Sequence, residues 1–396
     1  MKIGIFMHAY LPKIGGAQIQ THCLANSLSK MGQKVTVYSD KDLVKSCRKL
    51  GWEFCYDLEG VEYPYEIIIC GSVKVWLSLV GKKLRSIVRG DDLDVIQLIM
   101  AWPWLPAASK IKEIDVPVVV RAAGDDIQID TSLSYGIRRD HRKDVIIREG
   151  FKSISKAVAI SPSVTKEYVN IGVSRENIIE IAPGVDYKVF AGCEAGGSEI
   201  RRKWGIPIDK KIIISVGRNH PKKGFKDLIR ALKFLNKDND QFAVVIVGKG
   251  TNELISEAEK IGQEHNFIPV KEIAGFSANG IDTFPSIELI KLYKASNYFV
   301  LPSYIETFGN VKLEAIVAGI PVIVTDAPGC RDFIQDGKDG MIVPAHSPEK
   351  IAESILQLEK DPDLRQSIIE HGKLKARNQD WDNVARQYLE VYESLI

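Results

Sequence analysis

Short apolar runs rich in β-branched residues alternate along the chain with segments that have helical periodicity. In the first half, residues 17–32 (AQIQTHCLANSLSKMG) place apolar side chains at helical spacing and end at Gly32, a common helix terminator. The predicted strands of this half lie at 2–7, 34–38, 94–98 and 117–120. Strand, helix and strand in this order require crossover connections, so the pattern predicts a parallel sheet.

A second series of the same kind begins near Lys211. Its apolar runs lie at 211–216, 242–247, 298–303 and 321–326, and its helical segments at 225–235 and 253–262. Two such series in 396 residues predict an α/β protein with two doubly wound, Rossmann-like domains.

The boundary between the two series is predicted in the Gly-rich segment AGCEAGGS, residues 191–198. We therefore expect an N-terminal domain at 1–190 and a C-terminal domain at 191–375. Residues 376–396 are expected to form a C-terminal helix that packs back on the N-terminal domain. Residues 1–190 carry 26 basic and 22 acidic side chains, so the positive excess lies in the first domain.

Composition excludes several classes of protein. Hydrophobic residues make up 45% and charged residues 26% of the chain, as in a folded globular protein. The net charge of +2 argues against a nucleic-acid partner held by bulk electrostatics. Neither a long apolar run nor a signal peptide is visible, and the six cysteines form no CxxC pair. We expect a cytoplasmic protein with reduced thiols and no bound metal or cofactor.

The strongest candidate site is the segment YIETFGNVKLEA, which follows a predicted strand. A helix is expected to start near Phe308 or Gly309, and the free amides of its first turn are suited to a phosphate. The segment also holds two carboxylates, Glu306 and Glu314, that can accept hydrogen bonds from sugar hydroxyls. The alternative is that both glutamates are solvated residues that favour the helix dipole.

Two weaker signals lie at other strand ends. Arg218, Lys222 and Lys223 follow the strand that begins at Lys211 and could together neutralise a diphosphate. An ordinary basic loop is the alternative. Gly15 and Gly16 follow the first strand and precede a helix, which would let the backbone approach a phosphate, or would simply form a tight turn.

These patterns, in this order, resemble the retaining glycosyltransferases of family 4, whose GT-B fold has two facing Rossmann-like domains. The resemblance runs from Gly15-Gly16 through APGVD (182–186), VGR…KKG (216–224) and VGKG (247–250) to the DAPGCRDFIQDGKDGMIVP stretch. Glu306 and Glu314, with seven residues between them after a PS strand end, carry it most strongly.

The resemblance implies roles for individual residues. Arg218 and Lys223 would hold the donor diphosphate, Glu314 the ribose hydroxyls and Glu306 the donor sugar. Gly15 and Gly16 would approach the diphosphate from the other domain. The backbone at Thr307, Phe308, Gly309 and Asn310 would close around sugar and phosphate. The resemblance further implies that the catalytic residues are Glu306, Arg218, Lys223 and Asp126.

The chain departs from the family pattern in the segment VVVRAAGDDI. Ala123 stands where relatives often have a histidine, while Asp126 matches their acidic residue. Arg121 and Asp125 are candidates to compensate for the missing histidine. Such enzymes use no bound metal as a rule. Their base contacts are often backbone groups, here expected near 275–277, so UDP is only slightly favoured over GDP.

The resemblance implies a nucleotide-sugar donor and a hydroxyl acceptor on a glycan, a lipid-linked sugar or a small metabolite, with bacterial surface polysaccharide assembly as the setting. Residues 73–90 form a basic amphipathic segment that could lie on the inner face of a membrane, although a core-packing helix with a basic back is favoured. A second basic run at 137–152 is expected on the acceptor side. A sugar-nucleotide epimerase of the same architecture and a non-catalytic nucleotide-sugar-binding protein remain open as alternatives.

Overall fold

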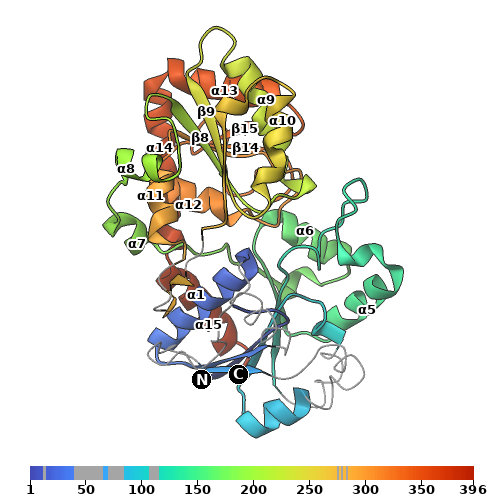
Figure 1. Ribbon diagram of the computed structural model, residues 1–396. Helices are drawn as coiled ribbons and strands as arrows, with labels where there is room; N and C mark the ends of the chain where they lie inside the picture. The colour runs from blue at the N-terminus through green and yellow to red at the C-terminus, as the bar shows by residue number, and fades with distance from the viewer. Residues whose placement is uncertain are drawn as a thin grey trace. The chain divides into compact units, whose positions relative to one another are not determined.

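The computed structural model describes residues 1–11, 15–39, 66–69, 84–106, 116–273, 276–277, 280–281 and 284–396. The chain forms two compact units (Figure 1). Unit 1 contains Met1–Gly184 and Trp381–Ile396, and unit 2 contains Val185–Asp380. The last helix of the chain therefore belongs with the first residues.

Unit 1 is built on a seven-stranded sheet in the order β3-β2-β1-β4-β5-β6-β7. All of its neighbouring strands are parallel, as the alternation of strands and helices predicts. Its strands are almost continuously buried, because helices cover both faces of such a sheet. They are β1 (Lys2–Met7), β2 (Lys34–Ser39), β3 (Glu66–Ile69), β4 (Val95–Ile99), β5 (Val118–Arg121), β6 (Lys156–Ala159) and β7 (Ile178–Glu180).

The helices of unit 1 lie on opposite sides of its sheet (Figure 1). On one side α1 (Gly16–Lys30) packs against α15 (Trp381–Glu393), and on the other lie α5 (His141–Phe151) and α6 (Pro162–Asn170). A buried hydrogen bond of 2.9 Å, in which the Tyr392 hydroxyl donates to Gln97 Oε1 of β4, fixes α15 to the sheet. Two short 3-10 turns, η1 (Ile137–Arg139) and η2 (Arg175–Asn177), complete the unit.

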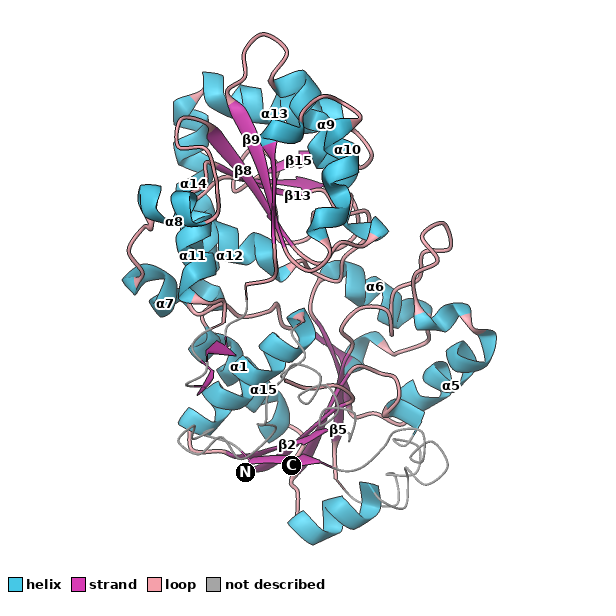
Figure 2. Cartoon of the chain, in the orientation of Figure 1, coloured by secondary structure: helices cyan, strands magenta, loops and turns pink. Residues whose placement is uncertain are grey.

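Unit 2 contains a six-stranded parallel sheet in the order β10-β9-β8-β13-β14-β15 (Figure 2). Its strands are β8 (Lys211–Val216), β9 (Phe242–Val247), β10 (Phe267–Val270), β13 (Tyr298–Leu301), β14 (Val322–Thr325) and β15 (Met341–Val343). A separate antiparallel pair joins β11 (Phe276–Ser277) to β12 (Gly280–Ile281).

The helices of unit 2 form two groups. α9 (Phe225–Leu235) packs against α13 (Pro348–Lys360), and their apolar faces share one buried cluster with the sheet. α12 (Asn310–Ala318) packs against α11 (Ile287–Lys294) and α14 (Pro362–Ala376). The shorter helices are α7 (Tyr187–Gly192), α8 (Gly197–Lys203), α10 (Ile255–Glu259), η3 (Pro221–Lys223), η4 (Thr251–Leu254), η5 (Glu264–Asn266) and η6 (Arg377–Gln379).

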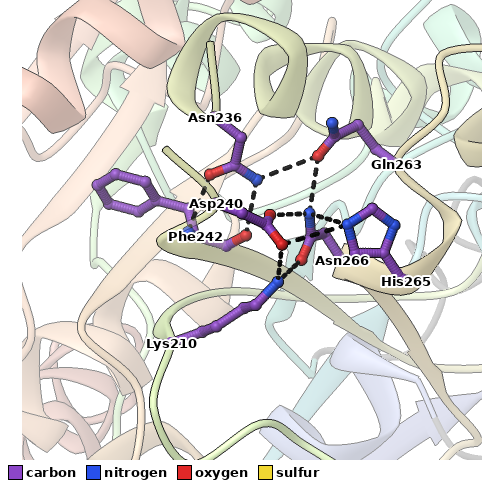
Figure 3. A network of polar contacts seen from close by, with 7 residues as sticks. All are labelled: Lys210, Asn236, Asp240, Phe242, Gln263, His265 and Asn266. Atoms are coloured by element: carbon purple, nitrogen blue, oxygen red, sulfur yellow. Dashed lines mark hydrogen bonds and ion pairs between the residues drawn. The ribbon is translucent and has the colours of Figure 1, made fainter. Parts of the chain in front are cut away.

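A polar network joins the amino ends of three neighbouring strands of unit 2 (Figure 3). Asn266, which is fully buried just before β10, contacts Asp240, Lys210, His265 and Gln263. The side chain of Asn236 bonds the Phe242 backbone at both its amide and its carbonyl and contacts Gln263. The network therefore holds these strand starts at the edge of the sheet opposite to the strand ends.

The division between the units falls at Gly184, a few residues before the expected boundary at 190. Val185 already belongs to unit 2, where its backbone amide donates to Gln379 O at 2.8 Å. α7 also contacts α12, so the residues before the Gly-rich segment pack with the second sheet. The chain thus crosses between units at 184–185 and again at 380–381.

Only part of the basic amphipathic segment at 73–90 can be described, since residues 70–83 lie outside the described residues. The rest belongs to a helical stretch at 84–91, in which Leu84 and Val88 are buried and Arg89 is exposed. This part therefore packs an apolar face into the core. Among the described residues, no helix is both long and apolar enough to cross a membrane.

Candidate donor site

The carboxyl end of β8 leads into the basic loop of unit 2. The loop runs from Gly217 through Arg218 and η3 to Gly224, where α9 begins. Gly224 has φ of +61°, and a Cβ atom there would lie 2.0 Å from the backbone oxygen of Pro302. A side chain at this position is excluded, so glycine lets the loop lie directly against the end of β13. Arg218 is exposed on the loop.

The carboxylate of Glu306 contacts the two lysines of this loop. Lys223 Nζ lies 2.5 Å from Glu306 Oε1, Lys222 Nζ lies 3.6 Å from Oε2, and the Ser303 hydroxyl donates to Oε1 at 3.1 Å. Glu306 is only 7% exposed. Burial acts to raise its pKa, but the charges of Lys223 and Lys222 outweigh this and lower the pKa to about 2. The cluster therefore carries a fixed carboxylate and a net positive charge.

The same strand end leads into α12. Gly309 is the N-terminal cap with φ of +79°, and it offers no side chain to the amides of the first turn. Thr307 and Phe308 are buried just before it, and Asn310 is the first helical residue. The amides at the start of α12 therefore retain hydrogen-bonding capacity, next to the loop that carries Glu306.

Glu314 lies on the second turn of α12 and is partly buried. The hydroxyl of Tyr293, on α11, donates to Glu314 Oε2 at 2.9 Å. Burial raises the pKa of Glu314 to about 7, although this hydrogen bond opposes the rise. The carboxyl group therefore titrates near neutral pH, which is expected of groups held ready for a ligand more often than of surface glutamates.

Lys312 is a site-forming residue that the sequence analysis missed. Its side chain is fully buried, and Nζ donates to the backbone oxygens of Gly329, Cys330 and Asp332 at 2.7, 2.9 and 2.5 Å. Nζ also lies 4.4 Å from the ring centroid of Phe308. Burial lowers the pKa of Lys312 to about 8. This lysine ties α12 to the loop after β14, and the only sequence signal is a charge within an apolar helical stretch.

The loop after β14 also contacts Glu306 directly. The amide of Glu306 donates to Pro328 O at 3.0 Å. Gly329 has φ of +76°, and a Cβ atom there would lie 1.8 Å from Glu306 O. Three strand ends, those of β8, β13 and β14, thus hold Glu306 in place.

The remaining candidate residues lie in unit 1. Gly15 precedes α1 with an extended backbone, and Gly16 is the first residue of that helix. Asp126 is fully buried, and its carboxylate accepts the backbone amides of Ala101, Ala123 and Gly124 at 2.6, 3.0 and 2.8 Å. These bonds fix the orientation of the Asp126 carboxylate, and the catalytic role that the resemblance implies stays a prediction. Burial raises its pKa, and the three amides oppose the rise.

The structure brings some of the candidate residues together. Lys223, Glu306 and the start of α12 share one edge of unit 2, as does the exposed Arg218 at the end of β8. His220 accepts the amide of Lys222 with Nδ1, as a loop residue would. The expected base contacts near 275–277 involve Gly275, which lies outside the described residues. Within the described part of the chain, no group of three or more His, Cys, Asp or Glu side chains is placed to hold a metal ion.

Comparisons with known proteins match both units. The model of the family described as Glycosyl transferases group 1 matches residues 197–375, and that of Glycosyltransferase Family 4 matches residues 14–189. A D-inositol 3-phosphate glycosyltransferase of Corynebacterium urealyticum is 31% identical over 96% of this chain and 91% of its own. An uncharacterized glycosyltransferase of Methanocaldococcus jannaschii is 25% identical over 99% of this chain and 98% of its own.

Solved structures share the fold. HepE of Anabaena, in complex with UDP, superimposes with a TM-score of 0.76 at 18% identity, with both chains covered in full (100%). Sucrose-phosphate synthase of Thermosynechococcus elongatus gives a TM-score of 0.77 at 17% identity, over 100% of this chain and 98% of its own. At these identities the likeness establishes the architecture of the two units.

Proposed function

Because the chain belongs to the family-4 glycosyltransferases and has their GT-B fold, we propose that it transfers a glycosyl group from a nucleoside diphosphate sugar to a hydroxyl group. One observation carries this proposal. The Lys222–Lys223–Glu306 cluster lies on the loops next to the uncapped start of α12. Positive side chains and free amides suit a diphosphate, and a fixed carboxylate suits a sugar hydroxyl.

The proposed roles follow from this arrangement. Arg218 and Lys223 bind the diphosphate, with the exposed Arg218 free to move onto it. The amides from Thr307 to Asn310 surround the sugar and phosphate, and Glu314 accepts hydrogen bonds from the ribose. Glu306 cannot leave its lysines without a large penalty, so it holds them in place next to the position proposed for the donor sugar.

In the reaction, the bond between the anomeric carbon and the phosphate oxygen breaks, and a bond to the acceptor oxygen forms. The acceptor proton moves to the leaving phosphate. Fixed positive charge stabilises the departing diphosphate, so no metal is required in this proposal. Departure and attack on one face would retain the anomeric configuration.

We propose UDP as the nucleotide, with GDP as the second candidate. HepE is crystallised with UDP and with UDP-glucose, which makes UDP-glucose the first donor to test. The Corynebacterium relative is named for D-inositol 3-phosphate, so phosphorylated small molecules join glycans and lipid-linked sugars as acceptors to test. Surface polysaccharide assembly, at the inner face of the membrane, is the proposed setting.

The test is donor turnover by the purified full-length chain in the presence of a chelator. Release of UDP from a UDP-sugar panel, with a sugar–acceptor product of unchanged anomeric configuration by NMR, supports the proposal. Epimerised free donor without acceptor would identify an epimerase instead. Binding of the nucleotide sugar without turnover on any acceptor would indicate a binding protein, and activity that a chelator abolishes would refute metal independence.

A further inference from the structure

Arg121 is the last residue of β5 and lies at the carboxyl edge of the sheet of unit 1. It pairs in register with Ile99 of β4, just as Val119 pairs with Gln97. Paired residues of parallel strands point to the same face, and residues two apart on a strand share that face. Since Gln97 contacts Tyr392 of α15, Arg121 points to the side of the sheet that α1 and α15 cover (Figure 1).

The charge of Arg121 acts on the side chains of buried tyrosines. Burial raises the pKa of Tyr388 and of Tyr392, and the positive charge of Arg121 opposes both increases. Its charge acts in the same sense on Tyr168, whose hydroxyl accepts the amide of the next residue, Ala122. These three tyrosines are themselves buried. The positive charge of Arg121 therefore acts on buried tyrosines of α15 and of α6.

In the described part of the chain, Arg121 has no anionic partner. Its side chain is only 4% exposed, yet no hydrogen bond or ion pair joins it to any other group among the described residues. The carboxylate of Asp126 is already occupied by three backbone amides. Another buried arginine of the same unit, Arg138, shows the ordinary arrangement, since it bonds Asp144 at 2.7 Å and Ile127 O at 2.5 Å.

A guanidinium that is 4% exposed and makes no hydrogen bond is costly, because its charge and its N–H donors have lost most of their water without gaining a protein acceptor. Selection for stability alone would replace it with an apolar side chain. A second polar group on this side of the sheet is only partly satisfied: Gln20 of α1 is 5% exposed, and its Nε2 atom donates to Gly184 O at 3.0 Å, but its Oε1 atom accepts no hydrogen bond. Both observations indicate a polar ligand that enters at the strand ends of unit 1.

We propose that Arg121 binds an oxyanion of the acceptor, a phosphate or a carboxylate group, at the carboxyl edge of the sheet in unit 1. The planar fork of arginine matches the paired oxygens of both groups. Strand ends of open parallel sheets are where such folds bind ligands. This inference rests on the proposed function only for the ligand's role as acceptor, since the anion site itself is a property of unit 1.

The test uses thermal melting of the full-length protein with added inorganic phosphate or acetate, against sodium chloride of equal ionic strength. UDP is kept saturating so that phosphate cannot act through the donor site. Arg121→Gln is compared with Lys166→Gln, which also removes one positive charge, from an exposed position of the same unit outside the basic run at 137–152. Arg121→Lys keeps the positive charge but removes the planar guanidinium with its paired N–H donors.

We expect phosphate or acetate to raise the melting temperature of the wild type and of Lys166→Gln. The anion that produces the shift then shows whether the acceptor group is a phosphate or a carboxylate. Arg121→Gln should lose this shift, with at least a tenfold weaker apparent affinity, and should melt no lower than the wild type without anion. Arg121→Lys should be intermediate. An anion shift in Arg121→Gln equal to that in Lys166→Gln would overturn the proposal.

UDP binding to each variant is measured separately. It distinguishes failure of the Arg121 anion site from failure of the proposed glycosyltransferase function. Intact UDP binding with an unchanged anion shift in Arg121→Gln refutes only the Arg121 site. Absence of UDP binding in the wild type refutes the donor proposal, and the anion comparison is then repeated without UDP in the Lys223→Met background.

Discussion

Glu314 should cost the protein stability at neutral and alkaline pH, and its replacement by glutamine should recover that stability. Burial raises its pKa from 4.5 to about 7, so the folded state holds a proton that the unfolded chain has lost. At about 1.36 kcal/mol for each unit of pKa, this corresponds to about 3 kcal/mol. The sign follows from linkage: the folded state binds more protons, so stability falls as pH rises from 4.5 to 7.

The assay is urea unfolding of the wild type and Glu314→Gln between pH 4.5 and 8.5. Glutamine keeps the shape and can still accept the hydrogen bond from Tyr293. The variant should match the wild type near pH 4.5 and exceed it by up to about 3 kcal/mol above pH 7. Tyr293→Phe, which removes the bond but keeps the carboxyl group, is the control and should retain the pH dependence.

The same substitution should weaken donor binding, because a carboxylate accepts ribose hydroxyl bonds more strongly than an amide does. Affinity of the wild type for UDP should rise with pH through about 7 and become nearly pH-independent in Glu314→Gln. A Glu314→Gln variant that is less stable at every pH would show that the carboxyl group does not destabilise the fold. A variant that binds UDP as tightly as the wild type would show that Glu314 does not contact the ribose.

Three further substitutions probe the rest of unit 2. Lys223→Met removes the nearer of the two lysines that contact the buried Glu306, so we expect a loss of about 3 kcal/mol in urea unfolding at pH 7. Because the lowered pKa of Glu306 stabilises the fold above pH 4.5, this loss should shrink as pH falls toward 2. Gly224→Val places a Cβ atom against Pro302 O and should cost more than about 2 kcal/mol by the same assay; a smaller effect would show that the loop can move. Asn266→Ala opens the network of Figure 3 and should cost about 1–3 kcal/mol while UDP affinity stays unchanged, since the network lies at the opposite sheet edge.

Long apolar runs predicted the sheets well. The runs at 211–216 and 242–247 are strands β8 and β9, and the helix expected from 17 begins at Gly16 as α1. Short strands such as β7 and β15, with three residues each, were not recognised, because so few residues show no periodicity. Their place is fixed by pairing with neighbours distant in the sequence, as β15 pairs with β14.

The candidate site could be predicted in its residue types but not in its pairings. Lys223 and Glu306 are 83 positions apart, so their ion pair follows from adjacent strand ends and not from a local motif. Lys312 was missed for the same reason, since the carbonyls that it binds lie 17 to 20 residues further along the chain. Arg121 was noted only as a substitute for a missing histidine, and its unpaired burial is visible only in the fold.

The most direct test of the central claim is calorimetric titration of the full-length chain with UDP and with GDP in the presence of a chelator. We expect one nucleotide site per chain, unchanged in Lys226→Met, whose exposed lysine lies three residues from Lys223. Lys223→Met should bind at least about tenfold more weakly, a difference of about 1.4 kcal/mol. Failure of both nucleotides to bind the wild type, or equal affinity in Lys223→Met, would contradict a diphosphate site at this edge of unit 2.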